Sequence, residues 1–480
     1  MEVNDSTQVL VIGGGPAGST VATLLAREGL DVTLVERAIF PRFHVGESLL
    51  PSCLEICDLI GAREKVEAHG FVRKHGGFFS WGRESWDLNF QNLPYPYGFQ
   101  VLRSEFDQLL LEHAKSEGVH VFEGVEIHDL SFDDNERPRR ATWKQVGAGR
   151  VGGEIAFDYL MDASGRDGLI ASRYRKNRRY HDAFQNVALW GYWTGATEMA
   201  FAPPGAIANG SIDDGWLWGI PLHDGTMSVG VVLHKTTFKE KRRQFGSLDE
   251  LYRAAIDDCP LIKGLVESGQ LVSRLRMEQD YSYLAETLAG PGYFQVGDAA
   301  CFIDPLLSTG VHLATHAAVL AAASLVSLMR GEVTEEQARG FYEQSYRQAY
   351  LRLAVIVSGM YQLYDGKKTY FWTAQQLTQH DYDDGDAVNQ AFLYVVSGLE
   401  DRQNSARALR EAEVALVASG VAEEEAQRTL FLHQAYHKVF FLSSLAPREA
   451  DPGLYVTTTP RLGLAWAAPT LQASEETAEV

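Results

Sequence analysis

A glycine-rich turn between two short apolar runs constrains this chain more than any other feature. Residues 9–12 are apolar and end at the turn 13–18 (GGGPAG), after which apolar residues recur at helical spacing over 19–27. A second apolar run, 32–35, ends on Glu36. This order of strand, glycine turn, helix and strand predicts the βαβ unit of an α/β, Rossmann-like dinucleotide-binding domain.

Each glycine of the turn has its own task in binding a dinucleotide. Gly13 permits the tight turn, Gly15 lets the backbone approach a pyrophosphate, and Gly18 allows close helix packing. The N–H groups of the helix that starts beside Ala17 are expected to point at the phosphates. Glu36 is expected to accept from the adenosine ribose hydroxyls, and a carboxylate there disfavours the 2′-phosphate of NADP.

Composition excludes several classes of partner. The chain has 480 residues, enough for two or three domains, and a net charge of -20. An acidic surface repels phosphates, so we expect no nucleic-acid partner and no membrane partner. The four scattered cysteines predict buried thiols rather than disulfides, and Cys53 and Cys57 lack the further ligands of a zinc site, so no metal is expected.

The N-terminus and the longest weakly polar stretch predict a cytoplasmic protein. The first residues lack the basic region of a signal peptide. Residues 311–329 contain His312 and His316 and are predicted to be too short and too polar to span a bilayer.

The composition and periodicity of the chain change along its length. Residues 181–280 are rich in Trp, Tyr and Val with glycine turns, which predicts strands, and helical periodicity dominates from residue 334. The predicted units are a discontinuous nucleotide-binding domain (1–180 and 281–333, with part of 70–100 in the second sheet), an inserted β-sheet substrate domain (181–280), a mainly helical C-terminal region (334–473) and a disordered tail (474–480).

Three further segments, in order, resemble the FAD-binding monooxygenase superfamily. They are the segment 99–110 (FQVLRSEFDQLL) with Gln100, Arg103 and Asp107, the segment 162–165 (DASG), and Gly297-Asp298-Ala299 after a strand. The resemblance implies FAD as the cofactor, with Asp298 near the ribityl–pyrophosphate region and Arg103 on a helix beside the isoalloxazine.

A W-x-W-x-I-P run resembles the signature of the flavin-dependent halogenases. It holds Trp216, Trp218 and Pro221, and alternate residues of a strand face the same side. An aromatic stripe in a sheet core is the alternative interpretation. In the halogenases this strand keeps the organic substrate away from the flavin, which implies a gating role here.

Lys74 stands where the halogenases carry their essential lysine. It lies in 71–77 (FVRKHGG), just before Trp81-Gly82, and Arg73 takes its place if the register slips by one residue. The alternative is a solvated lysine in a basic turn.

The step Ser308-Thr309-Gly310 resembles the halide site of the same family. Consecutive N–H groups at a helix N-terminus bind anions, so Thr309 and Gly310 are expected to hold chloride through the backbone, and Gly310 and Val311 to contact FAD. The alternative is an FAD-contacting helix start without halide. The run 41–51 (PRFHVGESLLP) also matches, which adds Arg42 and Ser48 to the cofactor-binding residues.

The resemblance covers about residues 8–375 and includes Tyr370-Phe371-Trp372. It is closest to halogenases of phenolic rings. Tryptophan halogenases carry Glu just before the S-T-G step, and here Leu307 stands there. A missing carboxylate implies a ring that activates itself, such as a phenol. Further aromatic residues after position 380 fit a pocket or a core equally well: Phe392, Tyr394, Tyr436 and Phe440.

The resemblance implies an FADH2-dependent halogenase that chlorinates an electron-rich, phenolic natural-product precursor, as in antibiotic biosynthesis. Chlorination would proceed through a flavin hydroperoxide and hypochlorous acid relayed to Lys74. A separate NADH-dependent flavin reductase is implied, since no second nucleotide fingerprint is present, and the small aromatic substrate is free or tethered to a carrier protein. The alternatives are an aromatic hydroxylase of the monooxygenase type, an FAD reductase resembling geranylgeranyl reductases, and a binding protein that keeps FAD but has lost catalysis.

Overall fold

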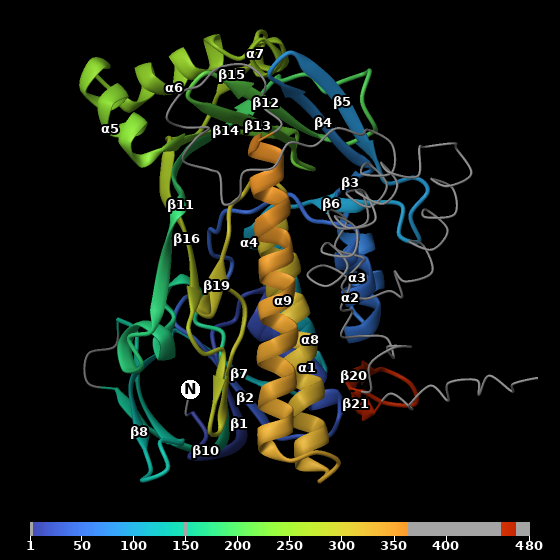
Figure 1. Cartoon of the computed structure of the whole chain (residues 1–480), viewed down its shortest axis with the longest axis vertical. Helices are drawn as coiled ribbons and strands as arrows, with labels where there is room; N and C mark the ends of the chain where they lie inside the picture. The colour runs from blue at the N-terminus through green and yellow to red at the C-terminus, as the bar shows by residue number, and fades with distance from the viewer. Residues whose placement is uncertain (1–2, 148–150, 363–452, 467–480) are drawn as a thin grey trace, which may run out of the picture.

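The computed structural model describes residues 3–147, 151–362 and 453–466. Two sheets lie at opposite ends of an elongated molecule, and the helices α8 (Thr309–Met329) and α9 (Glu335–Gln362) run between them (Figure 1). The long strands β11 (Arg178–Thr194) and β16 (Arg276–Ala285) also connect the two ends. The site is therefore built from both sheets and one end of α8.

The first sheet is the predicted Rossmann-like unit. Its order is β17-β18-β10-β1-β2-β7, and β1 pairs in parallel with β10 and β2. The strands β1 and β2 are buried on both faces, as the central strands of parallel sheets are. The α/β fold class is confirmed. The strands are β1 (Ser6–Ile12), β2 (Val32–Glu36), β7 (His120–Glu123), β8 (Val125–Phe132), β9 (Pro138–Gln145), β10 (Gly152–Asp162), β17 (Ala289–Gly290) and β18 (Tyr293–Gln295).

The second sheet has the order β19-β16-β11-β14-β13-β12-β4-β5, with β15 beside β11. It reaches past the predicted limits of 181–280, because β11 starts at Arg178, β16 ends at Ala285 and β4 and β5 join from far upstream. Its other strands are β4 (Gly76–Trp81), β5 (Glu84–Asn89), β12 (Ile207–Ile212), β13 (Gly215–Pro221), β14 (Thr226–His234), β15 (Gln270–Leu271) and β19 (Cys301–Phe302), and a separate pair is β3 (Val72–Lys74) with β6 (Gly98–Gln100).

The expectation of strands alone over 181–280 is wrong for its middle part. Three helices cover one face of the second sheet: α5 (Lys235–Gln244), α6 (Leu248–Asp257) and α7 (Pro260–Val266). Ser247 caps α6 by accepting from the N–H of Glu250. Leu251, Tyr252 and Ile256 recur at helical spacing and are buried on the sheet.

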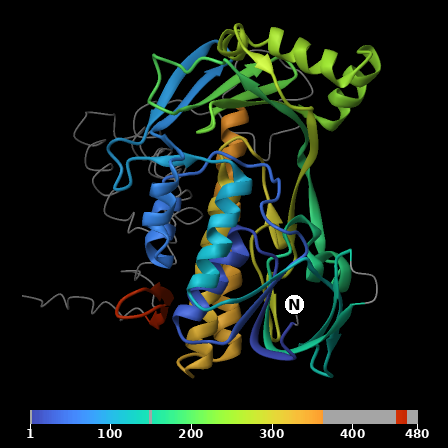
Figure 2. The ribbon, with the colours of Figure 1, turned by 180° about the vertical axis from the view of Figure 1, so that it is seen from behind.

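The remaining helices pack around α1 (Pro16–Arg27), which contacts both α8 and α4 (Arg103–Ser116). Seen from behind, α4 lies along the same helical column (Figure 2). The short helices α2 (Ser52–Ile60) and α3 (Arg63–His69) lie beside this helical column (Figure 1). Three further short helical segments are η1 (Gly165–Asp167), η2 (Leu169–Tyr174) and η3 (Gly297–Ala299). All four cysteines are buried free thiols, as predicted.

The prediction that residues 311–329 are too short and too polar to span a bilayer is wrong for the helix α8. By length and composition it is long and apolar enough to cross a membrane, with a mean hydropathy of 1.7. In the structure, 89% of the apolar 18-residue stretch of α8 is buried inside the protein. Burial in the protein core therefore explains the apolar composition of α8 without a bilayer.

The predicted helical C-terminal region is also only partly helical. Residues 335–362 form α9, but Leu454–Thr457 and Gly463–Trp466 form a two-stranded hairpin, β20 and β21. The hairpin packs on α8, where Ser327 Oγ accepts from the N–H of Leu464 at 2.7 Å. The segment 370–372, the four later aromatic residues and the acidic tail lie outside the described residues.

Candidate functional site

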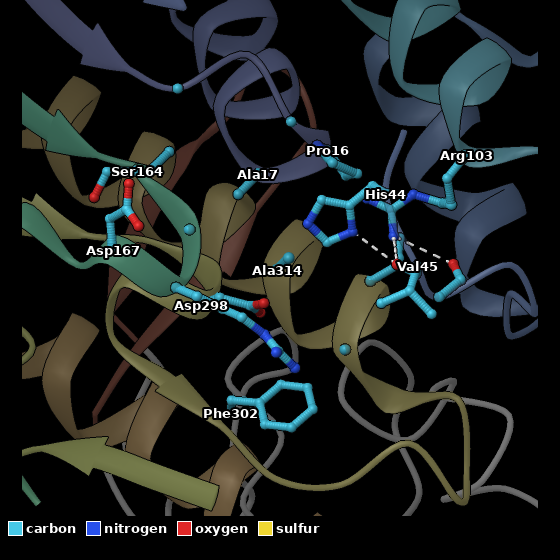
Figure 3. A pocket seen from close by; sticks show the side chains of 18 of the residues that line it. Pro16, Ala17, His44, Val45, Arg103, Ser164, Asp167, Asp298, Phe302 and Ala314 are labelled. Atoms are coloured by element: carbon cyan, nitrogen blue, oxygen red, sulfur yellow. Dashed lines mark hydrogen bonds between the residues drawn. The ribbon is translucent and has the colours of Figure 1, made fainter. Parts of the chain in front are cut away.

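A cavity of about 890 Å³ lies where the glycine turn, the start of α8 and the second sheet meet (Figure 3). Its volume lies within the range of cofactor sites. It is lined by most of the predicted cofactor residues: Gly13, Gly15, Ala17, Glu36, Arg42, Ser48, Arg103, Asp298, Gly310 and Val311. Gly18 is not in its wall but shapes the turn behind it.

The glycine turn leaves no room for side chains. Gly13 has φ +106, and a Cβ on it would lie 2.2 Å from the carbonyl oxygen of Ala163. A Cβ on Gly18 would lie 1.8 Å from the carbonyl oxygen of Gly13. Gly15 precedes the first turn of α1, so the free N–H groups of the helix face the cavity. This is a cradle for a dinucleotide phosphate, and FAD fits it.

Glu36 closes the turn from the side of β2. One carboxylate oxygen accepts from the N–H of Gly14 at 2.7 Å and the other from the N–H of Ala38 at 2.8 Å. The carboxylate is therefore held at the cavity wall, at the end of β2 where the sequence places the ribose contact.

Two arginines share one buried carboxylate. Arg103 makes a bidentate pair with Asp107 at 2.7 and 3.0 Å, and Arg42 lies 3.2 Å from the same Asp107. Arg103 and His44 both reach the carbonyl oxygen of Val45 (Figure 3). The buried hydroxyl of Ser48 faces the same cavity and has no partner there, which leaves it ready for a ligand.

The start of α8 presents its free N–H groups to the cavity. Ser308 has φ 59, in the left-handed region, and no side chain caps the helix. The preceding loop is fixed by Asp304, which accepts from the N–H of Leu306 at 2.9 Å and from Tyr361 at 3.0 Å. Thr309 and Gly310 line the cavity at this uncapped end of the helix, which favours an anion.

The two tryptophans of β13 face the cavity side of the second sheet, as the two-residue spacing predicts. Trp216 donates from Nε1 to the hydroxyl of Tyr361 at 2.9 Å, and Trp218 donates to Ser228 at 3.2 Å. Leu217 packs on the opposite face, and Pro221 is buried at the end of the strand without lining the cavity. Both indoles line the same cavity as the start of α8.

Lys74 is buried, whereas Arg73 points to solvent. The side chain of Arg73 is 56% exposed and pairs with Glu67 at 2.9 Å. Lys74 is 3% exposed, and its Nζ lies 5.8 Å from the ring centroid of Phe90. No ion pair involving Lys74 occurs among the residues that the structure describes. The two neighbouring side chains of β3 therefore differ in exposure, and the burial of Lys74 favours it over Arg73 as the essential lysine position.

A second cavity of about 20 Å³ surrounds Lys74 and adjoins the first. Ser308 and Ile207 line both cavities. Leu307, where tryptophan halogenases carry Glu, lies in the wall of the smaller cavity with Lys74. Ser308 and Ile207 therefore separate the larger cavity from the one that contains Lys74.

Burial lowers the pKa of Lys74 to about 7 from its ordinary value of 10.5. Below pH 7 both the folded and unfolded chains hold the proton, and the folded state bears the whole cost of the buried ammonium. Between pH 7 and 10.5 only the unfolded chain holds it, so folding stability rises with pH by about 1.4 kcal/mol per unit. We expect Lys74→Met to raise the melting temperature most at pH 6 and progressively less up to pH 9. A stability difference that does not change with pH would contradict the assigned pKa.

One residue of the cavity wall, Glu47, was not predicted from the sequence. Glu47 is buried in the cavity wall, accepts from Tyr192 at 2.6 Å and has a pKa raised by burial. The matched segment 41–51 contained the signal, but only Arg42 and Ser48 were selected from it. Outside both cavities, His69 and His223 each lie within 3.0 Å of Glu105. The hydrogen bond between His69 and Glu105 and the ion-pair contact of His223 with the same carboxylate account for this group.

Comparisons with known proteins agree with the geometry. The chain matches the tryptophan halogenase family over residues 8–95 and 87–459. Tryptophan 2-halogenase of Chondromyces crocatus is 47% identical over 97% of this chain and 95% of that protein. The sulochrin halogenase of Aspergillus terreus is 37% identical over 90% of this chain and 82% of its own length.

Two solved structures share the fold. The myxobacterial chondrochloren halogenase CndH, described as a variant of FAD-dependent halogenases, has a TM-score of 0.72 and 33% identity over 82% of this chain and 90% of that chain. The flavin-dependent halogenase CmlS has a TM-score of 0.75 and 29% identity over 96% of this chain and 84% of that chain.

Proposed function

The chain belongs to the tryptophan halogenase family of flavin-dependent halogenases, and on that premise we propose that it chlorinates a phenolic ring through Lys74. The observation that carries this proposal is the pair of adjoining cavities, one beside the glycine turn and one around Lys74, with Ser308 in the wall of both. A hydroxylase has no need of a buried lysine beyond the flavin cavity.

Reduced FAD, when bound, supplies together with O2 the two-electron oxidation of chloride to hypochlorous acid. The residues of the chain divide the remaining tasks. The uncapped start of α8 at Thr309 and Gly310 holds chloride by backbone N–H groups. Trp216 and Trp218 keep the organic ring out of the flavin cavity. Ser308 lies on the path by which the oxidised halogen leaves that cavity.

Lys74 receives the oxidised halogen at the end of this path. With a pKa of about 7 it is present at neutral pH both as an ammonium, which hydrogen-bonds hypochlorous acid, and as a free amine, which forms a chloramine and water. Either form holds electrophilic chlorine in a water-poor cavity until a ring arrives.

The substrate is proposed from the composition of the smaller cavity. Leu307 supplies no carboxylate to accept the ring proton, and a phenol donates electron density from its own oxygen. The similarity to a sulochrin halogenase is compatible with this class. The higher identity to a tryptophan 2-halogenase makes tryptophan the second candidate.

A direct competition separates the two substrates. The enzyme, a flavin reductase, NADH, FAD and chloride are supplied with tryptophan and with a panel of phenols, each free or attached to a carrier protein. We expect chlorinated phenol and no chlorotryptophan, measured by mass spectrometry. Chlorination of tryptophan in preference to every phenol would overturn the phenolic assignment and leave the family unaffected.

The reductase and the compartment belong to the same proposal. We infer that a separate NADH-dependent flavin reductase supplies the reduced flavin. The described residues contain one strand, glycine turn and helix of the dinucleotide-binding kind, the turn 13–18 before α1, and FAD takes it. The four free buried thiols are typical of a reducing compartment, so we place the reaction in the cytoplasm.

A further inference from the structure

The cavity around Lys74 contains a second polar side chain, Asn209 on β12. Asn209 is 1% exposed, and within residues 3–147, 151–362 and 453–466 neither its amide nitrogen nor its amide oxygen has a hydrogen-bond partner. Leaving a buried polar group unpaired lowers the free energy of unfolding. Two unpaired ends of one buried amide that lines a cavity therefore point to a bound partner, either a ligand or a water molecule, that completes the hydrogen bonds.

The backbone directs this amide into the cavity. Asn209 pairs in register with Phe79 of β4 on one side and with Trp218 of β13 on the other. Its neighbour Ala208 packs on the opposite face, against the core beneath α7, whereas Ile207 and Asn209 both line the Lys74 cavity. The amide is thus fixed by a central strand and is not a mobile surface group.

The size and chemistry of the cavity select its ligand. A volume of about 20 Å³ holds one water-sized molecule. The polar residues that line this cavity are Lys74, Asn209 and Ser308. The other lining residues are largely apolar: Leu50, Gly77, Phe79, Leu88, Phe90, Ile207, Leu306 and Leu307. A small neutral molecule with a donor and an acceptor, such as water or hypochlorous acid, matches this arrangement.

We propose that Asn209 is a further catalytic residue that binds hypochlorous acid beside Lys74. Its amide N–H donates to the oxygen of the acid, and its amide oxygen accepts the O–H. This inference rests on the proposed function, since it assigns a second binding group to the same relay.

The proposed contact favours chlorine transfer. The ring forms a C–Cl bond while the Cl–O bond breaks, and the oxygen leaves with the electron pair as hydroxide. The N–H of Asn209 stabilises the charge that develops on this oxygen, and the Lys74 ammonium gives it a proton to form water. The ring then loses its proton, which restores the ammonium. The sum is ring plus hypochlorous acid giving chlorinated ring plus water.

Asn209→Ala and Asn209→Leu test the proposal. Each variant is supplied with a reductase, NADH, FAD, chloride, a ring that the wild type chlorinates, and a 1,3-diketone that captures free hypochlorous acid. We expect chlorinated ring per flavin reoxidised to fall at least about tenfold, which is 1.4 kcal/mol. Captured acid should rise correspondingly, while FAD affinity and the rate of flavin reoxidation stay the same.

Stability gives a readout that does not depend on turnover. Because Asn209→Leu removes an unpaired buried amide, it should unfold at a higher temperature than the wild type. Asn177→Ala is the matched control, since Asn177 is also buried but donates to Thr287 at 2.8 Å and lies outside both cavities. It should leave the division between ring chlorination and captured acid unchanged.

If a folded Asn209 variant gives the wild-type ratio of chlorinated ring to captured hypochlorous acid, the proposed role of Asn209 is overturned. Chlorination that survives in Lys74→Ala would instead overturn the relay itself. The two failures are therefore distinguishable in one set of assays.

Discussion

Lys74→Ala should abolish ring chlorination, with a loss of at least about 100-fold, while flavin reoxidation continues at the wild-type rate. The reason is position: Lys74 lies in the smaller cavity and not in the wall of the flavin cavity, so its removal leaves the oxidation of chloride intact. The measurements are chlorinated product by mass spectrometry and reduced flavin by absorbance. Hypochlorous acid should then escape and be captured in solution.

Two control variants make this result specific. Lys74→Met keeps the apolar stem and the packing against Phe90 but removes the nitrogen, and it should fail as completely as alanine. Arg73→Met removes an exposed cation from the neighbouring position, whose partner is Glu67, and should chlorinate normally. Loss of chlorination in Arg73→Met with retention in Lys74→Met would show that the register was assigned wrongly.

Gly18→Ala should weaken FAD binding by at least about 100-fold, which is roughly 2.8 kcal/mol. The added Cβ would lie 1.8 Å from the carbonyl oxygen of Gly13, which is backbone and cannot rotate away. The turn must then shift, and with it the N–H groups at the start of α1 that cradle the phosphates. Titration of FAD, followed by flavin fluorescence, measures the loss.

Gly340→Ala is the matched control for this substitution. Gly340 lies inside the helix α9, and a Cβ there meets no atom within 4 Å. Alanine stabilises helix interiors relative to glycine by about 1 kcal/mol. We expect a slightly higher melting temperature and unchanged FAD affinity. Equal FAD affinity in Gly18→Ala and the wild type would refute the close-packing role of Gly18.

The sequence predicted the nucleotide fold because its signal is local. The turn at 13–18 combines three glycines with two flanking strands, and the backbone contacts of Gly13 and Gly18 allow no other residue. The facing of Trp216 and Trp218 was predictable for the same reason, because alternation is a property of any strand.

What the sequence did not predict depends on contacts between distant segments. The Asn209 amide lacks hydrogen-bond partners among the described residues because of how strands β4, β12 and β13 and the loop before α8 pack together. No local sequence pattern predicts this arrangement. The helices α5–α7 were different. Ser247 and Glu250 form a helix-start pattern that was present in the sequence, but the surrounding Trp- and Val-rich strands outweighed it.

The proposed enzyme oxidises halide in the flavin cavity and delivers the halogen to a ring beside Lys74. The mass of the product, measured with and without halide, tests this function. The enzyme is supplied with reduced FAD, O2 and a phenolic ring, in chloride, in bromide and without halide. A halogenase gives a product with the chlorine isotope pattern in chloride and leaves the ring unmodified when halide is absent. A product heavier by one oxygen atom without halide would instead identify a hydroxylase and rule out halogenation.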